Sequence, residues 1–363
     1  MNTNSASCHF CSIVPPHILK EITRRGSRGQ KELALQTLIQ SEQFRGLRSG
    51  LGILPFLMAV PVSGKWRTVY DAEQRSSLPG RLVREEGYPK SRDIAVNEAY
   101  DGAGAHYDFF KKVYGRDSLD NKGFQLDSSV HYGRNYDNAF WNGRQMVYGD
   151  GDGDLFDRFT KALDVIGHEL THGIVQFEAN LTYEGQSGAL NESFADVFGS
   201  LVKQYKNGQK AGEADWLIGE GLLKSKVQGK ALRSMKAPGT AYDDPVLGKD
   251  PQPAHMKDYV ETQEDNGGVH LNSGIPNRAF YETAIRLGGY AWKKAGQIWY
   301  VALRDRLKAN SNFEDAAKIT FAVAGELFGK SGKEAKAVKE AWHVVGIAKN
   351  NLVFHTKHAR NIL

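Results

Sequence analysis

The feature that most constrains this chain of 363 residues is the run His168-Glu169-Leu170-Thr171-His172, which lies in a helix-like stretch at residues 164–178. Side chains four positions apart project from one face of a helix, so the two imidazoles can share one ion. Zinc binds imidazole nitrogen readily, and a catalytic zinc site has three protein ligands and one position left for water. The run therefore predicts a helix here and a third ligand from elsewhere in the chain.

A candidate for that third ligand lies twenty residues after His172, in the run Asn191-Glu192-Ser193-Phe194-Ala195-Asp196. Glu192 and Asp196 are also four positions apart, which places them on one face of a second helix. The residues between the runs suffice for one helix to end and the chain to reverse. The alternative is a pair of surface histidines and a solvated acidic face, but such a pair would not require the partner carboxylates. We predict a metal site formed by His168, His172 and a carboxylate of this run.

Composition and charge exclude several classes of protein. The only cysteines are Cys8 and Cys11, so no disulfide can cross-link the chain after residue 11. The net charge is +5, and residues 1–50 hold seven Lys/Arg against three Asp/Glu, which leaves the rest nearly neutral. The basic run at residues 24–28 is too short for a nucleic-acid surface. We therefore expect no nucleic-acid partner.

The apolar segments are too short for a membrane protein. The most apolar stretch, residues 51–62, is interrupted by Gly52, Pro55 and Pro61, and it falls short of the roughly 20 residues that a membrane-spanning helix needs. The first 30 residues lack the apolar run of a classical signal peptide. We expect neither a membrane span nor a classical signal.

The pattern along the chain divides it into three parts. Residues 1–50 read as a separate unit, with a helix entered at Pro15-Pro16 and a second helix carrying Leu33, Leu35, Leu38 and Ile39. Alternating runs at residues 65–70, 125–132 and 145–148 predict strands, residues 93–114 predict a helix, and helical patterns dominate after residue 163. The acidic run at residues 150–154 lacks the spacing of a calcium loop and is interpreted as a turn.

Several motifs in order resemble the thermolysin-like neutral zinc metalloproteases, over residues 65–345. They are Asn138-Ala139-Phe140-Trp141-Asn142, His168 to His172, Asn191 to Asp196, Arg233-Ser234-Met235, and Asp265-Asn266-Gly267-Gly268-Val269-His270. The resemblance implies an α+β fold, a two-domain zincin with an N-terminal sheet-plus-helix domain at residues 51–182, a mainly α-helical C-terminal domain at residues 183–363, and the zinc site between them. It also implies a metalloendopeptidase that cleaves internal peptide bonds of protein or peptide substrates.

The resemblance also implies roles for individual residues, with His168, His172 and Glu192 as the three zinc ligands. Glu169 would take a proton from metal-bound water and pass it to the leaving nitrogen. His270 and Tyr183 would stabilise the oxyanion, and Asp265 would orient His270. Asp196 and Asn191 would fix the orientation of the zinc histidines. For Asp196 and Asn191 the alternative is helix capping or solvation.

The implied substrate contacts follow the same resemblance. Asn138 and Ala139 would pair with an extended substrate backbone, and Arg233 would hold a substrate carbonyl. Trp141 and Phe140 are interpreted as core residues. Five apolar positions match the pocket that would select a bulky hydrophobic residue just after the cleaved bond, or they belong to the ordinary core: Phe156, Phe159, Val165, Ile218 and Leu232.

The chain departs from the family at the residues that would bind calcium. Carboxylates of the family's calcium site remain as Asp164, Asp215 and Glu220, but Lys203 and Leu217 stand where the family has acids. An ammonium among carboxylates can substitute for one cation. We expect at most one calcium ion per chain.

The first fifty residues resemble the short pro-segment of the protealysin type, which carries a Pro-Pro motif, here within residues 14–19. We predict that residues 1–50 cover the active-site cleft as an intramolecular inhibitor and that cleavage near residues 48–51 activates the enzyme. Cys8 or Cys11 would reach the zinc as a thiolate, or both are incidental thiols of a loose tail.

The sequence allows more than one interpretation of localisation and of function. The family implies secretion, which without a classical signal requires another export route, and a cytoplasmic location is the alternative. Two alternatives to a protease are a catalytically silent zinc-dependent peptide-binding protein and a chain whose helical C-terminal half serves to dock a partner. Retention of Glu169, which zinc binding alone does not need, favours the enzyme over the first of these.

Overall fold

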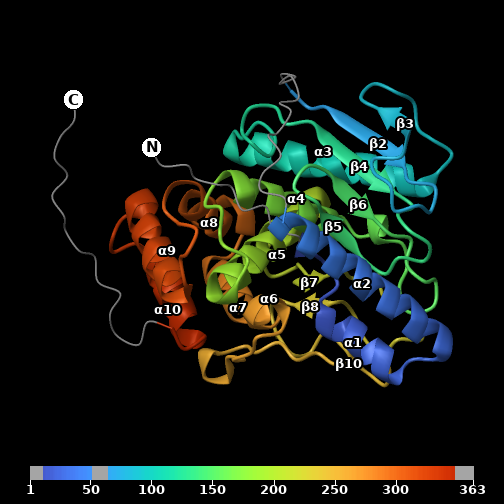
Figure 1. Ribbon diagram of the computed structural model, residues 1–363. Helices are drawn as coiled ribbons and strands as arrows, with labels where there is room; N and C mark the ends of the chain where they lie inside the picture. The colour runs from blue at the N-terminus through green and yellow to red at the C-terminus, as the bar shows by residue number, and fades with distance from the viewer. Residues whose placement is uncertain (1–10, 51–63, 348–363) are drawn as a thin grey trace.

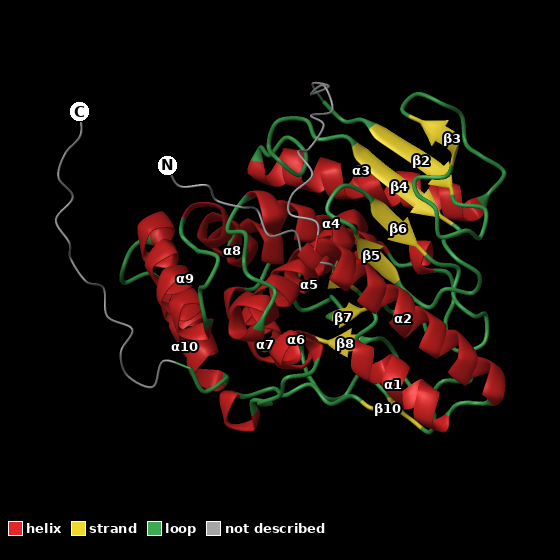
Figure 2. Ribbon diagram, viewed as in Figure 1, coloured by secondary structure: helices red, strands yellow, loops and turns green. Residues whose placement is uncertain are grey.

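The computed structural model describes the backbone of residues 11–50 and 64–347 and the side chains of residues 12–41 and 64–347. Figure 1 shows the sheet with α3 on one side of the molecule, α4 and α5 in the middle, and α7 to α10 on the other side. In Figure 2 the strands β2 to β6 gather in one part, whereas the opposite part is helical. The predicted α+β fold is confirmed.

A six-stranded sheet forms the N-terminal part, with the strand order β1-β5-β6-β4-β2-β3. β4 pairs in parallel with β2 and β6, and the other pairings are antiparallel. The strands are β1 Cys11–Ser12, β2 Arg67–Asp71, β3 Arg81–Glu85, β4 Leu126–Val130, β5 Ala139–Trp141 and β6 Met146–Tyr148. The three predicted strands are confirmed as β2, β4 and β6. The sequence did not reveal β3, because its Arg81, Arg84 and Glu85 interrupt the apolar alternation of an edge strand.

The predicted helix at residues 93–114 is confirmed as α3, Ile94–Tyr114. Asp93 caps it by accepting hydrogen bonds from two backbone amides of the first turn, and Gly115 ends it in the left-handed conformation. Ala95, Ala99 and Ala103 lie on one face of this helix and are buried. α3 packs on the sheet and on the helix α4, Leu163–Phe177. It therefore helps to position α4.

The rest of the structure is mainly helical and contains only short strands. Its longer helices are α4 Leu163–Phe177, α5 Gly185–Asn207, α6 Asp265–Asn272, α7 Gly274–Leu287, α8 Ala295–Asp305, α9 Phe313–Phe328 and α10 Lys333–Val344. Two antiparallel strand pairs join β7 Leu217–Ile218 to β8 Arg233–Ser234 and β9 Asp243–Asp244 to β10 Gly248–Lys249. Three 3₁₀ turns complete the list: η1 Phe159–Lys161, η2 Met256–Asp258 and η3 Ala291–Lys293.

The helices α4 and α5 cross at very close range, which brings their polar residues together. A Cβ atom on Gly199 of α5 would lie 2.5 Å from the carbonyl oxygen of Asp164 and 2.9 Å from the backbone nitrogen of His168. Only glycine can occupy this crossing without moving the backbone. The second helix therefore approaches the first closely enough to add a ligand.

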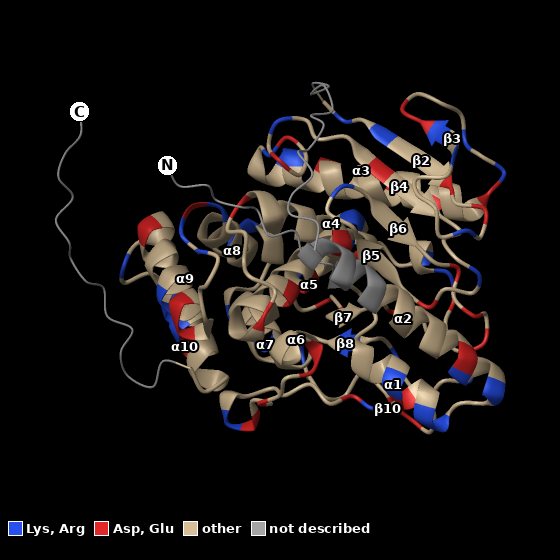
Figure 3. Ribbon diagram, in the orientation of Figure 1, with Lys and Arg blue, Asp and Glu red and all other residues tan. Residues whose placement is uncertain are grey.

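Residues 11–50, the described part of the predicted pro-segment, contribute the edge strand β1 and two helices, α1 Pro16–Arg25 and α2 Arg28–Gly50. α1 begins at the second proline, as predicted, and buries Ile18, Leu19 and Ile22. Figure 3 shows mainly basic residues along this helix, and the ammonium of Lys20 lies 2.9 Å from the carboxylate of Glu264 beside α6. Apolar burial and this ion pair attach the segment to the helical part. Cys8, the Cys11 side chain and residue 51 lie outside the described residues.

The turn at residues 150–154 is confirmed. Asp152 Oδ1 accepts hydrogen bonds from the backbone amides of residues 154, 155 and 156, and Gly151 and Gly153 have positive φ angles. Within the described part of the chain, no helix combines the length and the apolarity needed to cross a bilayer.

Candidate metal centre

Three buried side chains from the two crossed helices converge on one point. His168 and His172 come from α4 and Glu192 from α5, and one ligand atom of each lies within 4.8 Å of the others. The two Nε2 atoms are 3.0 Å apart. Each is 3.5 Å from a carboxylate oxygen of Glu192. The structure thus brings together the three residues predicted as ligands.

This geometry fits a tetrahedral zinc ion. Zinc binds nitrogen and oxygen at about 2 Å, so its ligand atoms stand roughly 3.3 Å apart. The three observed separations bracket that value. Glu192 Oε2 is buried and has no hydrogen-bond partner among the described residues, although a buried carboxylate oxygen is costly without one. A cation bound to the three side chains would satisfy it.

The outer nitrogens of both histidines are held by residues of α5. His168 Nδ1 donates to Asp196 Oδ1 at 2.7 Å, and His172 Nδ1 donates to Asn191 Oδ1 at 2.9 Å. These bonds leave each Nε2 as the free lone-pair nitrogen that a metal needs. Burial lowers the pKa of His172 to about 4, so its ring is neutral near pH 7.

Asp196 is itself held by two further groups. Arg233 Nε and Nη2 donate to its two oxygens at 2.9 and 2.8 Å, and Asn277 Nδ2 donates to Oδ2 at 2.8 Å. Burial alone would raise the pKa of Asp196, but the charges of Arg233 and His168 lower it below its usual value. Asp196 is therefore a carboxylate at neutral pH. No sequence pattern pointed to Asn277, which comes from α7.

Glu169 lies on the same helix, between the two histidines, and is completely buried. Its Oε2 accepts a hydrogen bond from the backbone amide of Trp141 at 2.9 Å. Its Oε1 has no partner among the described residues. Burial, and next the charge of Glu192, raises the pKa of Glu169 well above its usual value, and a bound cation would act in the opposite direction. Glu169 thus has one oriented oxygen and one oxygen free to take a proton.

His270 and Tyr183 lie beside the same point. His270 Nδ1 donates to Asp265 Oδ1 at 2.7 Å, and its Nε2 lies 3.2 Å from the Tyr183 hydroxyl. Tyr183 also contacts Glu192. Burial alone would lower the pKa of His270, but Asp265 and then Glu192 raise it. A left-handed backbone at residues 265–268 shapes the turn that carries the pair. The predicted orientation of His270 by Asp265 is present.

The predicted substrate-contact residues face the pro-segment. Asn138 Oδ1 accepts a hydrogen bond from the Val14 amide at 2.9 Å. Arg233 Nη1 donates to the Ile13 carbonyl at 2.8 Å. Trp141, interpreted as a core residue, is buried, and its amide also holds Glu169.

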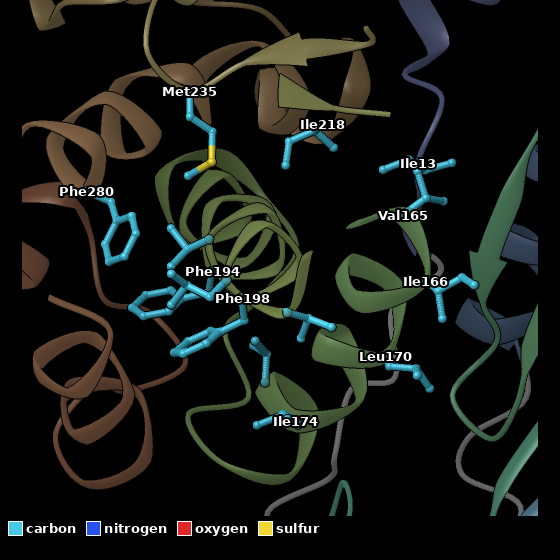
Figure 4. Packing of buried hydrophobic residues seen from close by; sticks show 14 of the residues in the cluster. Ile13, Val165, Ile166, Leu170, Ile174, Phe194, Phe198, Ile218, Met235 and Phe280 are labelled. Atoms are coloured by element: carbon cyan, nitrogen blue, oxygen red, sulfur yellow. The ribbon is translucent and has the colours of Figure 1, made fainter. Parts of the chain in front are cut away.

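The five predicted pocket residues are all buried and share one cluster with Ile13: Phe156, Phe159, Val165, Ile218 and Leu232. Figure 4 shows Ile13 near Val165, with Ile218 on the same side of the view. The order of α4 places Val165 about one helical turn before His168. An apolar region therefore adjoins the metal ligands.

The predicted calcium residues surround an ammonium group. Lys203 Nζ donates to Asp164 Oδ2 at 2.8 Å and to the Leu217 carbonyl at 3.0 Å, and it lies 3.0 Å from Asp215 Oδ1. A hydrogen bond to Asp215 raises the pKa of Glu220. Lys203 lies where a cation would have to bind these carboxylates.

Comparison with known proteins identifies the family. Residues 63–176 match the thermolysin metallopeptidase catalytic domain, and residues 179–347 match the thermolysin metallopeptidase alpha-helical domain. An extracellular metalloprotease of Pectobacterium carotovorum subsp. carotovorum is 54% identical over 339 residues, 93% of this chain and 96% of that protein. Protease PrtS of Photorhabdus sp. (strain Az29) is 48% identical over 93% of this chain and 92% of that protein.

Among solved structures, the precursor of protealysin, a metalloproteinase from Serratia proteamaculans, superposes with a TM-score of 0.86 at 54% identity. The match covers 93% of this chain and all of that structure. The chain therefore belongs to the thermolysin family of metallopeptidases and is a protease of the protealysin type.

Proposed function

We propose that this protein is a zinc metalloendopeptidase made as a latent precursor, with His168, His172 and Glu192 as zinc ligands and Glu169 as the catalytic base. The observation that carries the proposal is the convergence of the three ligand atoms beside the unpartnered Oε1 of Glu169. The orienting bonds from Asp196 and Asn191 support it.

The mechanism assigns a task to each polar group. Zinc, when bound, would act as a Lewis acid toward water and the substrate carbonyl. Glu169 Oε1 takes the proton of the attacking water and hands it to the leaving nitrogen, while the Trp141 amide fixes the other oxygen. His270 and Tyr183 donate hydrogen bonds to the developing oxyanion, and Asp265 keeps His270 protonated and oriented.

Substrate selection follows from the strand and the apolar residues. Asn138 and Ala139 offer hydrogen bonds to an extended peptide at the sheet edge, and Arg233 holds a carbonyl. The buried cluster around Val165, Ile218, Leu232, Phe156 and Phe159 adjoins the ligands and favours cleavage before a bulky hydrophobic residue. Because the Pectobacterium relative is named an extracellular metalloprotease, we propose that this protein is exported from the cell.

Latency follows from the position of the pro-segment. Asn138 Oδ1 accepts a hydrogen bond from the Val14 amide, and Arg233 Nη1 donates one to the Ile13 carbonyl. Both groups are therefore engaged and cannot bind a substrate at the same time. We propose cleavage near residues 48–51 as the activating event and domain boundaries at residues 50 and 182.

The test is hydrolysis of a quenched peptide with a central leucine, by full-length protein and by protein from which residues 1–50 have been removed. We expect activity to rise after removal and to disappear with a zinc chelator, because the ligands no longer hold an ion that activates water. Readdition of zinc should restore it. Zinc-loaded, folded, pro-segment-free protein that binds the peptide without cleaving it would instead identify a catalytically silent binding protein.

Lys203 gives a prediction about calcium. Replacing it by methionine leaves Asp164 and Asp215 without a cation, and breaking a buried pair in this way costs about 3–5 kcal/mol. In Lys203→Glu we expect added calcium to raise the melting temperature, because the additional carboxylate completes a cation site. Thermal unfolding with calcium and with chelator measures this, and wild-type protein is the control. A large calcium-dependent shift in the wild type would contradict the substitution of ammonium for calcium.

A further inference from the structure

The pro-segment crosses the site as an extended strand in a defined register. Ser12 lies opposite Phe140 in an antiparallel pairing of β1 with β5. The Ile13 amide donates to the Ala139 carbonyl at 3.1 Å, and the Val14 amide donates to Asn138 Oδ1 at 2.9 Å. Three consecutive residues are thus held through their backbones.

The carbonyl groups of Ser12 and Ile13 are held by two different side chains. The Ser12 carbonyl oxygen accepts a hydrogen bond from His270 Nε2 at 3.0 Å. The next carbonyl, that of Ile13, accepts from Arg233 Nη1 at 2.8 Å. His270 is the residue whose position suits an oxyanion donor. The Ser12 carbonyl therefore occupies the place of a carbonyl under attack, and the Ile13 nitrogen that of the leaving group.

His270, which contacts this bond, also lies close to two other residues of the proposed site. His270 Nε2, which holds the Ser12 carbonyl, is 3.5 Å from Glu192 Oε1 and 3.2 Å from the Tyr183 hydroxyl. Glu169 is fixed by the amide of Trp141. Trp141 belongs to β5, the same strand that holds the pro-segment. One strand therefore positions both the base and the bond.

The side chain after the bond is apolar and fully buried. Ile13 has no exposed surface and belongs to the cluster that contains Val165 and Ile218. The following residues are anchored as well, because α1 starts at Pro16 and buries Ile18 and Leu19. The segment after the bond is thus held in place through side chains and backbone, as a bound peptide substrate would be.

We propose that the Ser12–Ile13 peptide bond is a self-cleavage site, cut within the same molecule before any cleavage near residues 48–51. This inference rests on the proposed peptidase function. One water molecule is consumed: its oxygen bonds to the Ser12 carbonyl carbon, the carbon–nitrogen bond breaks, and Glu169 transfers the proton of the water to the Ile13 nitrogen. The products are a carboxylate at Ser12 and a free amine at Ile13, with no change of oxidation state.

The experiment uses full-length protein prepared without metal, to which zinc is added while intact mass and N-terminal sequence are followed. We expect loss of residues 1–12 and a new N-terminus at Ile13. The rate should be independent of protein concentration over about a hundredfold range, because the bond is already bound in its own site. A rate proportional to concentration, or a chain that stays intact at this bond, overturns the proposal.

Two substitutions at the residue after the bond test the register. Ile13→Asp should slow the cut at least about a hundredfold, because a carboxylate cannot enter an apolar buried region unpaired. Ile13→Leu is the matched control and should be cut. A second readout needs no turnover: in full-length Glu169→Gln protein, hydrogen exchange should show protection of the Ile13 and Val14 amides, and this protection should be lost in Ile13→Asp. Exchange as fast as in an unstructured peptide overturns the register.

Failure of the proposal and failure of the proposed function can be told apart. The same zinc-loaded preparation is treated with trypsin to remove the pro-segment and is then given the quenched peptide. If the peptide is cleaved but the Ser12–Ile13 bond never is, the peptidase function stands and the self-cleavage proposal is wrong. If the peptide is not cleaved under any condition, both fail together.

Discussion

Glu169→Gln should reduce kcat for peptide hydrolysis by roughly 10²–10⁴-fold, the usual contribution of a general base. The amide keeps the size of the side chain and can still accept the hydrogen bond from the Trp141 amide through its oxygen. The amide nitrogen that replaces Oε1 cannot accept a proton from the attacking water. Initial rates with the quenched peptide, measured on pro-segment-free protein, give the loss.

The zinc content of Glu169→Gln should stay at that of the wild type, because Glu169 is not among the three converging ligand residues. Metal analysis of the dialysed protein checks this. Glu184→Gln is a matched control, since Glu184 is an exposed glutamate just before α5. If Glu169→Gln keeps wild-type kcat, the base is another group and the assignment is wrong.

Asp196→Ala should cost about 3–5 kcal/mol of the free energy of unfolding, the range for a buried ion pair that loses one partner. Asp196 has no exposed surface, and its removal leaves the Arg233 guanidinium buried without its carboxylate. The amide of Asn277 also loses its acceptor. Urea unfolding of zinc-free protein isolates this cost from any effect of metal binding.

The same substitution should weaken zinc binding by about 10–100-fold, because His168 loses the acceptor that fixes its ring and tautomer. Competition with a chromogenic chelator measures this affinity. Asp243→Ala removes an exposed carboxylate and should change neither quantity. Unchanged zinc affinity in folded Asp196→Ala protein would contradict the orienting role of Asp196.

The sequence by itself determined the elements that carry the site. The spacing of His168 and His172, and the run around Glu192, predicted two helices and a pair of histidine ligands, because side-chain direction in a helix is a local property. The family resemblance named Glu192 as the third ligand. The cap at Asp93 and the Pro15-Pro16 entry likewise marked helix starts through local backbone chemistry. Resemblance, rather than spacing, nominated His270, Tyr183 and Arg233.

Only the tertiary structure decided how these elements combine. The Trp141 amide orients Glu169 across 28 residues of sequence, and Asn277 reaches Asp196 across 81. The contact of the Ser12 carbonyl with His270 spans 258 residues. No local pattern encodes such contacts, because they depend on how closely α4 and α5 cross and on which strand lies at the sheet edge. The ligands could therefore be predicted from the sequence, whereas the partners that orient them and the peptide bond held beside them follow from packing.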